Sequence, residues 1–453
     1  MLISAQIKNF LSYKEDKDGN GILFSMIGGK VRSKSEHLYR DHNLKVLKFS
    51  ALYGANASGK SNLIKAIKFI QSSLIEGLPD NADDLYCKMD PDGKDKPSEF
   101  SIKFLLGKDC YQYLFRIILS KKSIIEESLF ELHPERQIFY RNTQTGEFRI
   151  SQVNFNSELR ERFLMYAEDV ATDDTVLFLR LINRNKESLY ERYPEVSFFR
   201  EIYRWFQSKL YVGLPDEPVS DYSYLVRPDK KELTKEALVL IRRFSTGITD
   251  CKIVEVPVEK VLGELPSNIR TIILKRLKES VVSHRRKGEK GSAALIMRNR
   301  NRLFVITMKD DEEQPRCRTI KFLHGVNSPM FNLSEESDGT VRLFDLLDLL
   351  LDTDDKTFFI DEFDRSLHPA LSHELIKMFL ENTKHKNTQL IVTTHDTELM
   401  NLDLLRRDEI WFAGKMQDNT TNLYSMEEFK TRFDKDIRRA YLDGTYGAIP
   451  KFE

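Results

Sequence analysis

Eight consecutive residues have the types and the spacing of a loop that binds phosphate: Gly54, Ala55, Asn56, Ala57, Ser58, Gly59, Lys60 and Ser61. They fit the pattern G-x-x-x-x-G-K-[ST], in which glycines let backbone N–H groups turn inward around phosphate oxygens. Lys60 would reach the β- and γ-phosphates, Ser61 would offer a hydroxyl to Mg²⁺, and Asn62 would complete the binding set. The alternative, a glycine-rich turn with an exposed lysine, is disfavoured because an apolar run precedes the loop and a helical pattern follows it.

A second chemical signal is the apolar run Thr357–Glu362, which ends in two acids. Its first four residues predict a buried strand, and acids at its carboxyl end would face the crevice where such sheets bind ligands. Asp361 is suited to hold Mg²⁺ directly or through water, and Glu362 to polarise an attacking water as general base. Such an ending is common by itself, but together with the loop it predicts hydrolysis of a nucleotide.

His395 ends another apolar run and stands 34 residues after Asp361. A lone histidine at a strand end is more often structural. At this distance from the acids, however, it suits a histidine that contacts the γ-phosphate and senses its loss. We therefore predict that His395 is catalytic together with Lys60 and Glu362.

Ser337 and Gly339 lie just before an apolar helical run, and Ser337 stands 24 residues before Asp361. A serine hydroxyl and a glycine N–H at a helix start can donate hydrogen bonds to a phosphate. The simpler alternative is an ordinary N-cap, in which the serine only satisfies the first turn of its own helix.

Several expected elements would position these residues. Val46–Tyr53 is an apolar run of strand length, and the apolar spacing after it predicts a helix from Ser61 to about Leu74. The last third of the chain predicts helix 341–351, strand 357–360, helix 370–380 and strand 389–393. Because such alternation is typical of parallel sheets with crossover helices, we expect an α/β fold around the loop.

Composition predicts three segments along the chain. Residues 1–154 hold strand-like runs, and residues 155–302 are rich in Leu, Glu, Arg and aromatics at helical spacing, which predicts a mainly helical insertion. Residues 303–453 begin with an expected strand pair, 303–308 and 319–323. The expected architecture is thus a mixed sheet plus a parallel P-loop core, interrupted by the insertion.

The bulk composition sets broad limits on function. Lys plus Arg and Asp plus Glu both number 70, so net charge indicates neither a nucleic-acid nor a membrane partner. The four cysteines, Cys87, Cys110, Cys251 and Cys317, lie far apart, which disfavours a zinc site or a disulfide framework. No run approaches the ~18 apolar residues of a membrane helix. We expect a cytoplasmic protein.

One local exception to the charge balance is the stretch from His284 to Arg302. It carries seven basic residues and one acid, Glu289; the basic residues are Arg285, Arg286, Lys287, Lys290, Arg298, Arg300 and Arg302. The run from Arg285 to Arg302 could neutralise nucleic-acid phosphates, which would make binding steeply salt-dependent. A solvated loop on the insertion is the simpler interpretation.

Taken in order, these motifs resemble those of ABC-type ATPase heads of the SMC, RecF and OLD group. Ser337–Thr340 resembles their LSGGQ signature, and Phe363–Pro369 resembles the D-loop that follows the catalytic Glu. The segments Ile7–Phe10 and Tyr441–Pro450 resemble the bacterial single-gene branch that includes the RloA and AbiL-type proteins and, more loosely, the AriA ATPase of anti-phage systems.

This resemblance covers about residues 1–150 and 303–450 and implies a head that uses ATP and Mg²⁺. In such heads the signature of one subunit closes over ATP held by another. Ser337 and Gly339 would therefore act in trans, in a homodimer or higher oligomer joined head to head. The glutamine that touches Mg²⁺ in these heads has only two candidates here, Gln112 and Gln137.

The resemblance also bears on the biological role. OLD nucleases carry a nuclease domain after the head, whereas 58 residues follow His395 in this sequence, without a cluster of carboxylates. The chain is therefore expected to be the ATPase sensor or regulator of an anti-phage, abortive-infection system whose effector, a nuclease or toxin, is a separate protein. The alternatives are a RecF- or SMC-like DNA-binding ATPase in repair, which the basic run favours, and a nucleotide-gated scaffold with negligible turnover.

Overall fold

A computed structural model of the chain describes residues 1–41, 44–151, 156–215, 217, 231–286, 292–299, 302–309, 314–326, 329–351, 355–429 and 436–449. The chain divides into two compact units. Unit 1 comprises Met1–Leu214, Thr353–Asp364 and Ser372–Glu453, and unit 2 comprises Pro215–Asp352 and Arg365–Leu371.

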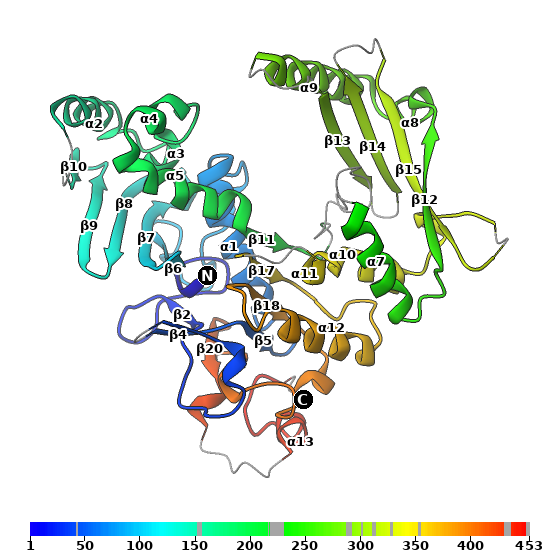
Figure 1. Cartoon of the computed structure of the whole chain (residues 1–453). Coiled ribbons are helices and arrows are strands. Elements are labelled where there is room, and N and C mark those ends of the chain that lie inside the picture. Colours follow the sequence, from blue (N-terminus) through cyan, green and yellow to red (C-terminus); the bar gives the residue numbers. More distant parts are fainter. Residues whose placement is uncertain are drawn as a thin grey trace. The chain divides into compact units, whose positions relative to one another are not determined.

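The core of unit 1 is a six-stranded sheet (Figure 1), with the order β11 (Leu210–Gly213), β17 (Thr357–Ile360), β18 (Gln389–Thr393), β5 (Phe49–Tyr53), β19 (Ile410–Lys415) and β20 (Thr421–Ser425). All neighbours are parallel except β19 and β20. Every residue of β5, β17 and β18 is buried, as expected of central strands covered on both faces. The predicted parallel α/β core is confirmed.

Helices cross over between these strands. Helix α1 (Lys60–Ile75) follows β5 after the phosphate loop, and α12 (Pro369–Asn382) lies between β17 and β18 in the chain. A short helix, α13 (Ile437–Leu442), follows β20. The strands predicted at 357–360 and 389–393 have those bounds, because an uninterrupted apolar run leaves few alternative registers.

A second sheet of unit 1 is antiparallel and has seven strands, in the order β10 (Glu147–Ile150), β9 (Glu135–Asn142), β8 (Ser123–Leu132), β7 (Asp109–Ile118), β6 (Ser98–Leu106), β1 (Leu2–Lys8) and β2 (Ile22–Ser25). Figure 1 shows β6 to β9 as successive neighbours. Charged residues in β8 and β10 obscure the alternation of apolar positions that would identify these two strands from the sequence.

The apolar run Val46–Tyr53 is not one strand, contrary to the prediction. It is divided between β4 (Leu44–Leu47), which pairs with β3 (Leu38–Asp41), and β5 in the parallel sheet. Lys48 stands at the break and is buried, with Nζ donating to the carbonyl oxygens of Thr383 and Lys384 at 2.7 Å each. The lysine therefore binds carbonyl groups just beyond the end of α12, where a cation is favourable.

Residues 155–302, which the sequence predicts to be mainly helical, hold both helices and strands. In unit 1 they form α2 (Ser157–Val170), α3 (Phe178–Leu181), α4 (Glu187–Arg192), α5 (Ser197–Arg204) and β11. In unit 2 they form α7 (Lys231–Arg243), β12 (Asp250–Val256), α8 (Val258–Gly263), α9 (Ser267–Arg286) and β13 (Ser292–Asn299).

A buried ion pair within the antiparallel sheet holds the carboxylate that binds the start of α3. Arg141 on β9 and Glu127 on β8 are both fully buried, with 3.1 Å between Arg141 Nη2 and Glu127 Oε2. Glu127 also accepts hydrogen bonds from the backbone N–H groups of Phe178 and Leu179, and from the hydroxyl of Tyr113. Because the buried carboxylate is paired and hydrogen-bonded, the cost of its burial is offset.

Unit 2 is built on an antiparallel sheet of the order β12, β15 (Arg316–Leu323), β14 (Arg302–Lys309) and β13, with β16 (Phe331–Asn332) beside β15. Strands β14 and β15 confirm the predicted strand pair. A cluster of apolar residues from α8 and α9 covers one face of this sheet. Helices α10 (Asp338–Leu346) and α11 (Asp348–Leu351) divide the predicted helix 341–351 in two.

Candidate nucleotide site

The phosphate loop lies between β5 and α1, as the pattern requires. A Cβ atom on Gly54 would stand 2.5 Å from Ser58 Oγ and 2.6 Å from the carbonyl oxygen of Ala413. Gly59 has φ +96°, a left-handed conformation that favours glycine. Both glycines of the pattern are therefore required by the backbone of this loop.

Side chains far away in the sequence hold the loop in place. Thr421 Oγ1, on β20, donates to the carbonyl oxygen of Ser58 at 2.7 Å, and the hydroxyl of Tyr13 donates to that of Gly59 at 3.0 Å. The hydroxyls of Ser12 and Thr421 are 2.6 Å apart. None of these three supporting residues was predicted, since nothing in their spacing along the chain connects them to the loop.

Asn62, the last residue of the predicted binding set, lies in the first turn of α1. Its side-chain amide donates to Ser12 Oγ at 2.6 Å. Asn62 therefore supports the loop through Ser12, whose hydroxyl also contacts Thr421.

Lys60 is buried, and its ammonium group is bound by the loop itself. Nζ donates to the carbonyl oxygens of Gly54 at 2.9 Å and Ala55 at 3.0 Å. Burial lowers the pKa of Lys60 to about 8, against the opposing effect of Asp361, Asp364 and Glu362. The ammonium group is therefore held where phosphate oxygens can replace carbonyl partners.

Asp361 and Ser61 meet although 300 residues separate them in the chain. Ser61 Oγ donates to Asp361 Oδ1 at 3.0 Å, and Asp361 is buried at the end of β17. Thr393, at the end of β18, donates to the same oxygen at 2.5 Å and fixes the carboxylate. This hydroxyl–carboxylate pair has the chemistry of a Mg²⁺ site in which phosphates supply further oxygens.

The electrostatics near Lys60 fit a divalent cation as well. The single ammonium group faces three carboxylates, those of Asp361, Glu362 and Asp364. Among the described residues, no group of three or more His, Cys, Asp or Glu could hold a metal by itself. Mg²⁺ would therefore depend on nucleotide oxygens in addition to Ser61 and Asp361, which is its usual mode of binding with substrate phosphates.

Glu362 has a fixed backbone and a side chain within reach of solvent. Its φ is +47°, in the left-handed region, and its N–H donates to Thr393 Oγ1 at 2.9 Å. The residue is half-buried, so water can reach the carboxylate. Non-glycine residues in this conformation are uncommon and cluster at functional sites.

His395 follows β18 by two residues, in the same unit as the loop. Its backbone N–H donates to both carboxylate oxygens of Asp364, each at 3.3 Å. Partial desolvation and, secondly, the charge of Lys60 lower the pKa of the imidazole. Both effects favour the neutral imidazole, which has one nitrogen that donates and one that accepts a hydrogen bond.

Ser337 and Gly339 belong to unit 2, whereas the loop and the acids belong to unit 1. Ser337 is exposed and caps α10, with Oγ accepting from the N–H of Thr340 at 3.2 Å. A Cβ on Gly339 would stand 2.7 Å from the carbonyl oxygen of Ser366, in the D-loop segment. The N-cap geometry is thus present, and the signature-like turn packs closely against the D-loop within its own unit.

The glutamine candidates belong to unit 1 and the basic run belongs to unit 2, where Arg298 of the run contacts α10. Gln112 on β7 donates to Ser101 Oγ, and Gln137 on β9 is exposed, so both belong to the antiparallel sheet. In the basic run, Arg298 is paired with Asp345, and Arg302 with Glu264 at 2.6 Å. The side chains of Arg285, Arg286, Lys287, Lys290 and Arg300 lie outside the described residues.

A protein-family model described as "AAA domain, putative AbiEii toxin, Type IV TA system" matches residues 49–401. None of the curated proteins matches the chain. No helix in the described part of the chain has both the length and the apolar character that crossing a membrane requires.

Solved structures similar to the chain include SMC heads. An SMC head bound to the C-terminal winged-helix domain of ScpA is 16% identical, with a TM-score of 0.38 and coverage of 94% of this chain and 97% of that one. The SMC head domain of Thermotoga maritima is 14% identical (TM-score 0.32; 94% and 98% covered). A Pyrococcus furiosus SMC head with an extended coiled coil, bound to the C-terminal domain of ScpA, is 13% identical (TM-score 0.33; 94% and 96% covered). At such identities and TM-scores the likeness says nothing of what this chain binds.

Proposed function

The chain belongs to the AAA-domain family described as putative AbiEii toxin, type IV TA system, and from this premise we propose that it binds and hydrolyses ATP to switch its own assembly. The observation that carries the proposal is the 3.0 Å hydrogen bond from Ser61 Oγ to Asp361 Oδ1. It joins a phosphate loop to an acidic strand end in the arrangement that ATP with Mg²⁺ requires.

Each residue of the site has a distinct proposed role. The loop N–H groups and Lys60 bind the β- and γ-phosphates, and Ser61 and Asp361 would hold Mg²⁺, which supplies charge neutralisation on the phosphate oxygens when bound. Glu362 accepts a proton from the attacking water, and the half-buried position of its carboxylate permits this. Neutral His395 contacts the γ-phosphate and loses that contact after hydrolysis.

A second copy of the chain would complete the site. Ser337 is exposed, and Gly339 lies in the first turn of α10, so a hydroxyl and backbone N–H groups are presented together at one helix start. We place these groups on the ATP of a partner protomer, as in ABC-type heads. ATP would then join two protomers, and its hydrolysis would release them.

The experiment is mass measurement of the protein with and without ATP, in the wild type and in Glu362→Gln. The amide cannot accept the proton of the water, so the variant should bind ATP, turn over slowly and accumulate as the dimer or higher oligomer. Glu374→Gln on α12 is the matched control and should behave like the wild type. Equal hydrolysis by Glu362→Gln and the wild type would remove Glu362 from the chemistry.

We further propose that this switch controls a separately encoded effector in an anti-phage, abortive-infection system. The family description names a toxin–antitoxin system, which has two components, and gives this domain as the putative toxin; that the effector is a second protein is our own addition. Deletion of the neighbouring genes should abolish phage resistance, and tagged protein should co-purify with one of their products. Intact resistance after deletion, with only this chain recovered, would exclude the two-gene arrangement.

The alternative function is DNA binding in repair, and the basic run from Arg285 to Arg302 is the feature that favours it. Two of its arginines, Arg298 and Arg302, already have carboxylate partners in the structure. A mobility-shift titration against salt separates the alternatives, because neutralisation of several phosphates gives a steep loss of affinity with salt.

A further inference from the structure

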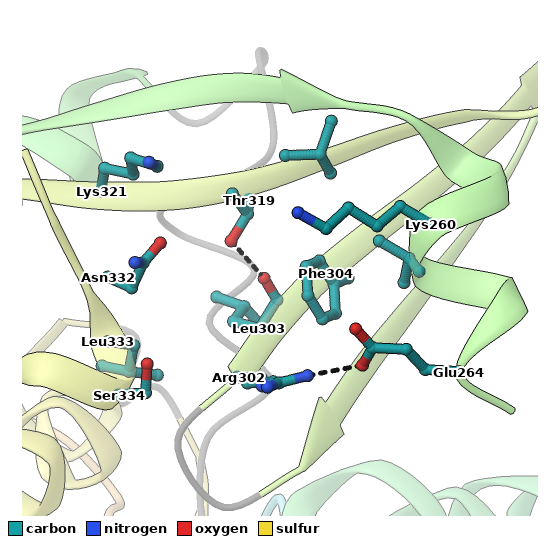
Figure 2. Close-up of a pocket in the computed structure, with 12 residues that line it drawn as sticks. Lys260, Glu264, Arg302, Leu303, Phe304, Thr319, Lys321, Asn332, Leu333 and Ser334 are labelled. Carbon is teal, nitrogen blue, oxygen red and sulfur yellow. Dashed lines mark hydrogen bonds and ion pairs between the residues drawn. The ribbon is translucent and has the colours of Figure 1, made fainter.

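Unit 2 contains a cavity of about 340 Å³ whose lining shares only Arg302, the last residue of the basic run, with the motifs above (Figure 2). This volume is within the range of small-ligand sites, which are commonly of ~300–1,000 Å³. Its lining comes from β12, α8, β14, β15, β16 and the turn Leu333–Glu335. The cavity therefore lies where several segments of the unit converge.

The floor of the cavity is a patch of the antiparallel sheet. Phe304 on β14 lies opposite Thr319 on β15, and Lys321 on β15 lies opposite Asn332 on β16. Thr319 Oγ1 donates to the carbonyl oxygen of Leu303 at 2.7 Å, which fixes the hydroxyl in the floor (Figure 2). An aromatic ring thus stands beside a row of polar groups.

The wall opposite the turn is α8 and the residue just after it. Lys260 extends over the floor toward Thr319 and Phe304, while Glu264 is bound to Arg302 at 2.6 Å (Figure 2). Apolar residues of α8 and α9 cover the neighbouring part of the same sheet face. The cavity lies at the end of this apolar layer, where the helices no longer cover the sheet.

The charge of the cavity is positive. Its lining holds Lys260, Arg302 and Lys321 against one acid, Glu264, which Arg302 already neutralises. In the described part of the chain, no carboxylate lies within the ion-pair distance of 4.0 Å from the ammonium group of Lys260 or Lys321. Glu335 lies close enough to Lys321 for a weak electrostatic effect, but its carboxylate is bound by Asn332.

We propose that this cavity binds a phosphorylated nucleoside, with the phosphate between Lys260 and Lys321 and the base against Phe304. Two ammonium groups that no carboxylate of the described residues approaches within ion-pair distance favour a phosphate, and an exposed part of an aromatic ring favours a flat base. The nucleoside is either a free mononucleotide or the 5′-phosphorylated end of a single strand, since both carry the same phosphate and base. It is not the ATP of the phosphate loop, which lies in the other unit.

The site has a direct route to the signature-like turn. Leu333 and Ser334 line the cavity, and Ser337 follows Ser334 by three residues at the N-cap of α10. A ligand that contacts the Leu333–Glu335 turn would favour one position of Ser337. This regulatory consequence rests on the proposed function, whereas the binding itself does not.

Binding is tested in a Lys60→Ala background, which removes nucleotide binding at the phosphate loop. Calorimetric titration with AMP should show one site, and Lys260→Ala with Lys321→Ala should weaken it by at least about tenfold, since each lost charge-assisted contact is a substantial part of the affinity. The matched control is Lys275→Ala with Lys278→Ala on α9, which removes the same charge from exposed positions outside the cavity and should leave AMP affinity unchanged. No AMP binding, or equal weakening in both double variants, overturns the proposal.

Two further ligands identify the source of the nucleoside. A 5′-phosphorylated single-stranded hexadeoxyadenylate that competes with AMP, while the same strand without the 5′-phosphate does not, indicates a strand end. If AMP binds and neither strand competes with it, the ligand is a free nucleotide. Binding of inorganic phosphate as tight as that of AMP would overturn the part assigned to Phe304.

Regulation is a separate measurement. This measurement uses protein with Lys60 intact and the ligand identified above. The KM for ATP should then differ between Lys260→Ala with Lys321→Ala and the control, Lys275→Ala with Lys278→Ala. An inactive ATPase would contradict the proposed function but leave AMP binding in the Lys60→Ala background intact. Loss of AMP binding in an active ATPase would contradict only this inference.

Discussion

ATP binding should change the protonation of Lys60 at alkaline pH. Burial lowers its pKa to about 8 in the free protein, and triphosphate oxygens would raise the pKa because they favour the charged form. Above pH 8 binding must therefore take up a proton, and affinity should fall by up to about tenfold per pH unit until the pKa of the complex is reached. Below pH 8 the group is already charged, and affinity should be flat.

Calorimetric titration of ATP at pH 8.5, in two buffers of different ionisation enthalpy, measures this uptake. Lys60→Arg is the control, because a guanidinium stays charged throughout and should show no uptake if it binds. Wild-type affinity that is constant from pH 7.5 to 9.5 would contradict the assignment of Lys60 to the phosphates.

At the scale of elements, the packing of the first turn of α10 against the D-loop requires glycine at position 339. A methyl group on Gly339 would come within 2.7 Å of the carbonyl oxygen of Ser366, so Gly339→Ala must separate the signature-like turn from the D-loop. We expect at least about a tenfold loss of kcat, as removal of a transition-state contact commonly costs ~10²–10³. Gly263→Ala, at the end of α8, has nothing within 4 Å and should leave kcat unchanged.

The stability of unit 1 should depend on the ion pair between Arg141 and Glu127, whose carboxylate binds the start of α3. Arg141→Met leaves the carboxylate of Glu127 buried without its charge partner, which should destabilise unit 1 by about 3–5 kcal/mol. Urea unfolding followed by tryptophan fluorescence measures it, because both tryptophans, Trp205 and Trp411, are buried in unit 1. Arg149→Met, from an exposed pair with Glu147, should change stability by less than about 1 kcal/mol.

Addition of Glu127→Gln to Arg141→Met tests the cause of that loss. The amide carries no charge and retains one oxygen, which can still accept from the N–H of Leu179 and the hydroxyl of Tyr113, whereas the N–H of Phe178 loses its acceptor. The double variant should therefore recover part of the stability. Absence of recovery would indicate that the lost hydrogen bonds of Arg141 to the carbonyl oxygens of Val170, Asp173 and Val176, rather than the uncompensated charge, set the effect.

At the scale of the whole molecule, the division of the site between protomers can be tested by mixing two inactive variants. Lys60→Ala removes ATP binding, and Ser337→Arg blocks the surface that would cover the ATP of a partner. Each alone should be inactive, but a mixed dimer contains one site with both Lys60 and Ser337. An equal mixture should regain about a quarter of wild-type turnover, since half of the dimers are mixed and each has one complete site.

Absence of any recovery, together with normal dimerisation of the mixture by mass, would contradict the trans arrangement. So would normal hydrolysis by Ser337→Arg alone. The control is an equal mixture of two separate variants, Lys275→Ala and Ser337→Arg. Lys275 lies on the exposed face of α9, so the Lys275→Ala protomer keeps both Lys60 and Ser337.

The sequence predicted the parts of this molecule in which the local pattern and the fold agree. The strands that precede Asp361 and His395 were predictable because a mostly apolar run is typical of a buried strand in a parallel sheet, and the polar residues after it must lie at the carboxyl edge of that sheet. The contact of Ser61 with Asp361 follows from that topology. The division of 46–53 at Lys48 did not follow, since one lysine in an apolar run does not reveal whether it points to water or to buried carbonyl groups.

Other features depend on contacts between distant segments, which a single sequence does not encode locally. Ser12, Tyr13 and Thr421 support the phosphate loop from two other strand ends, and each is an ordinary residue in its own surroundings. Strand β11 is a short run inside an aromatic, helix-like region and is a strand only because it extends the sheet beside β17. In unit 2, β14 and β15 were predicted, whereas polar residues conceal β12 and β13, which are strands through their pairing with β15 and β14.

The path of the chain after Glu362 limits how the signature-like turn can be exchanged between proteins. Residues Arg365–Leu371 leave unit 1 after Asp364, belong to unit 2, and return at Ser372. A transplant of Pro215–Asp352 alone would move Gly339 but leave behind Ser366, against which it packs. Unit 2 is therefore not one continuous segment of the chain. A functional chimera needs two separate exchanges, and the second begins at Arg365, three residues after the proposed general base Glu362.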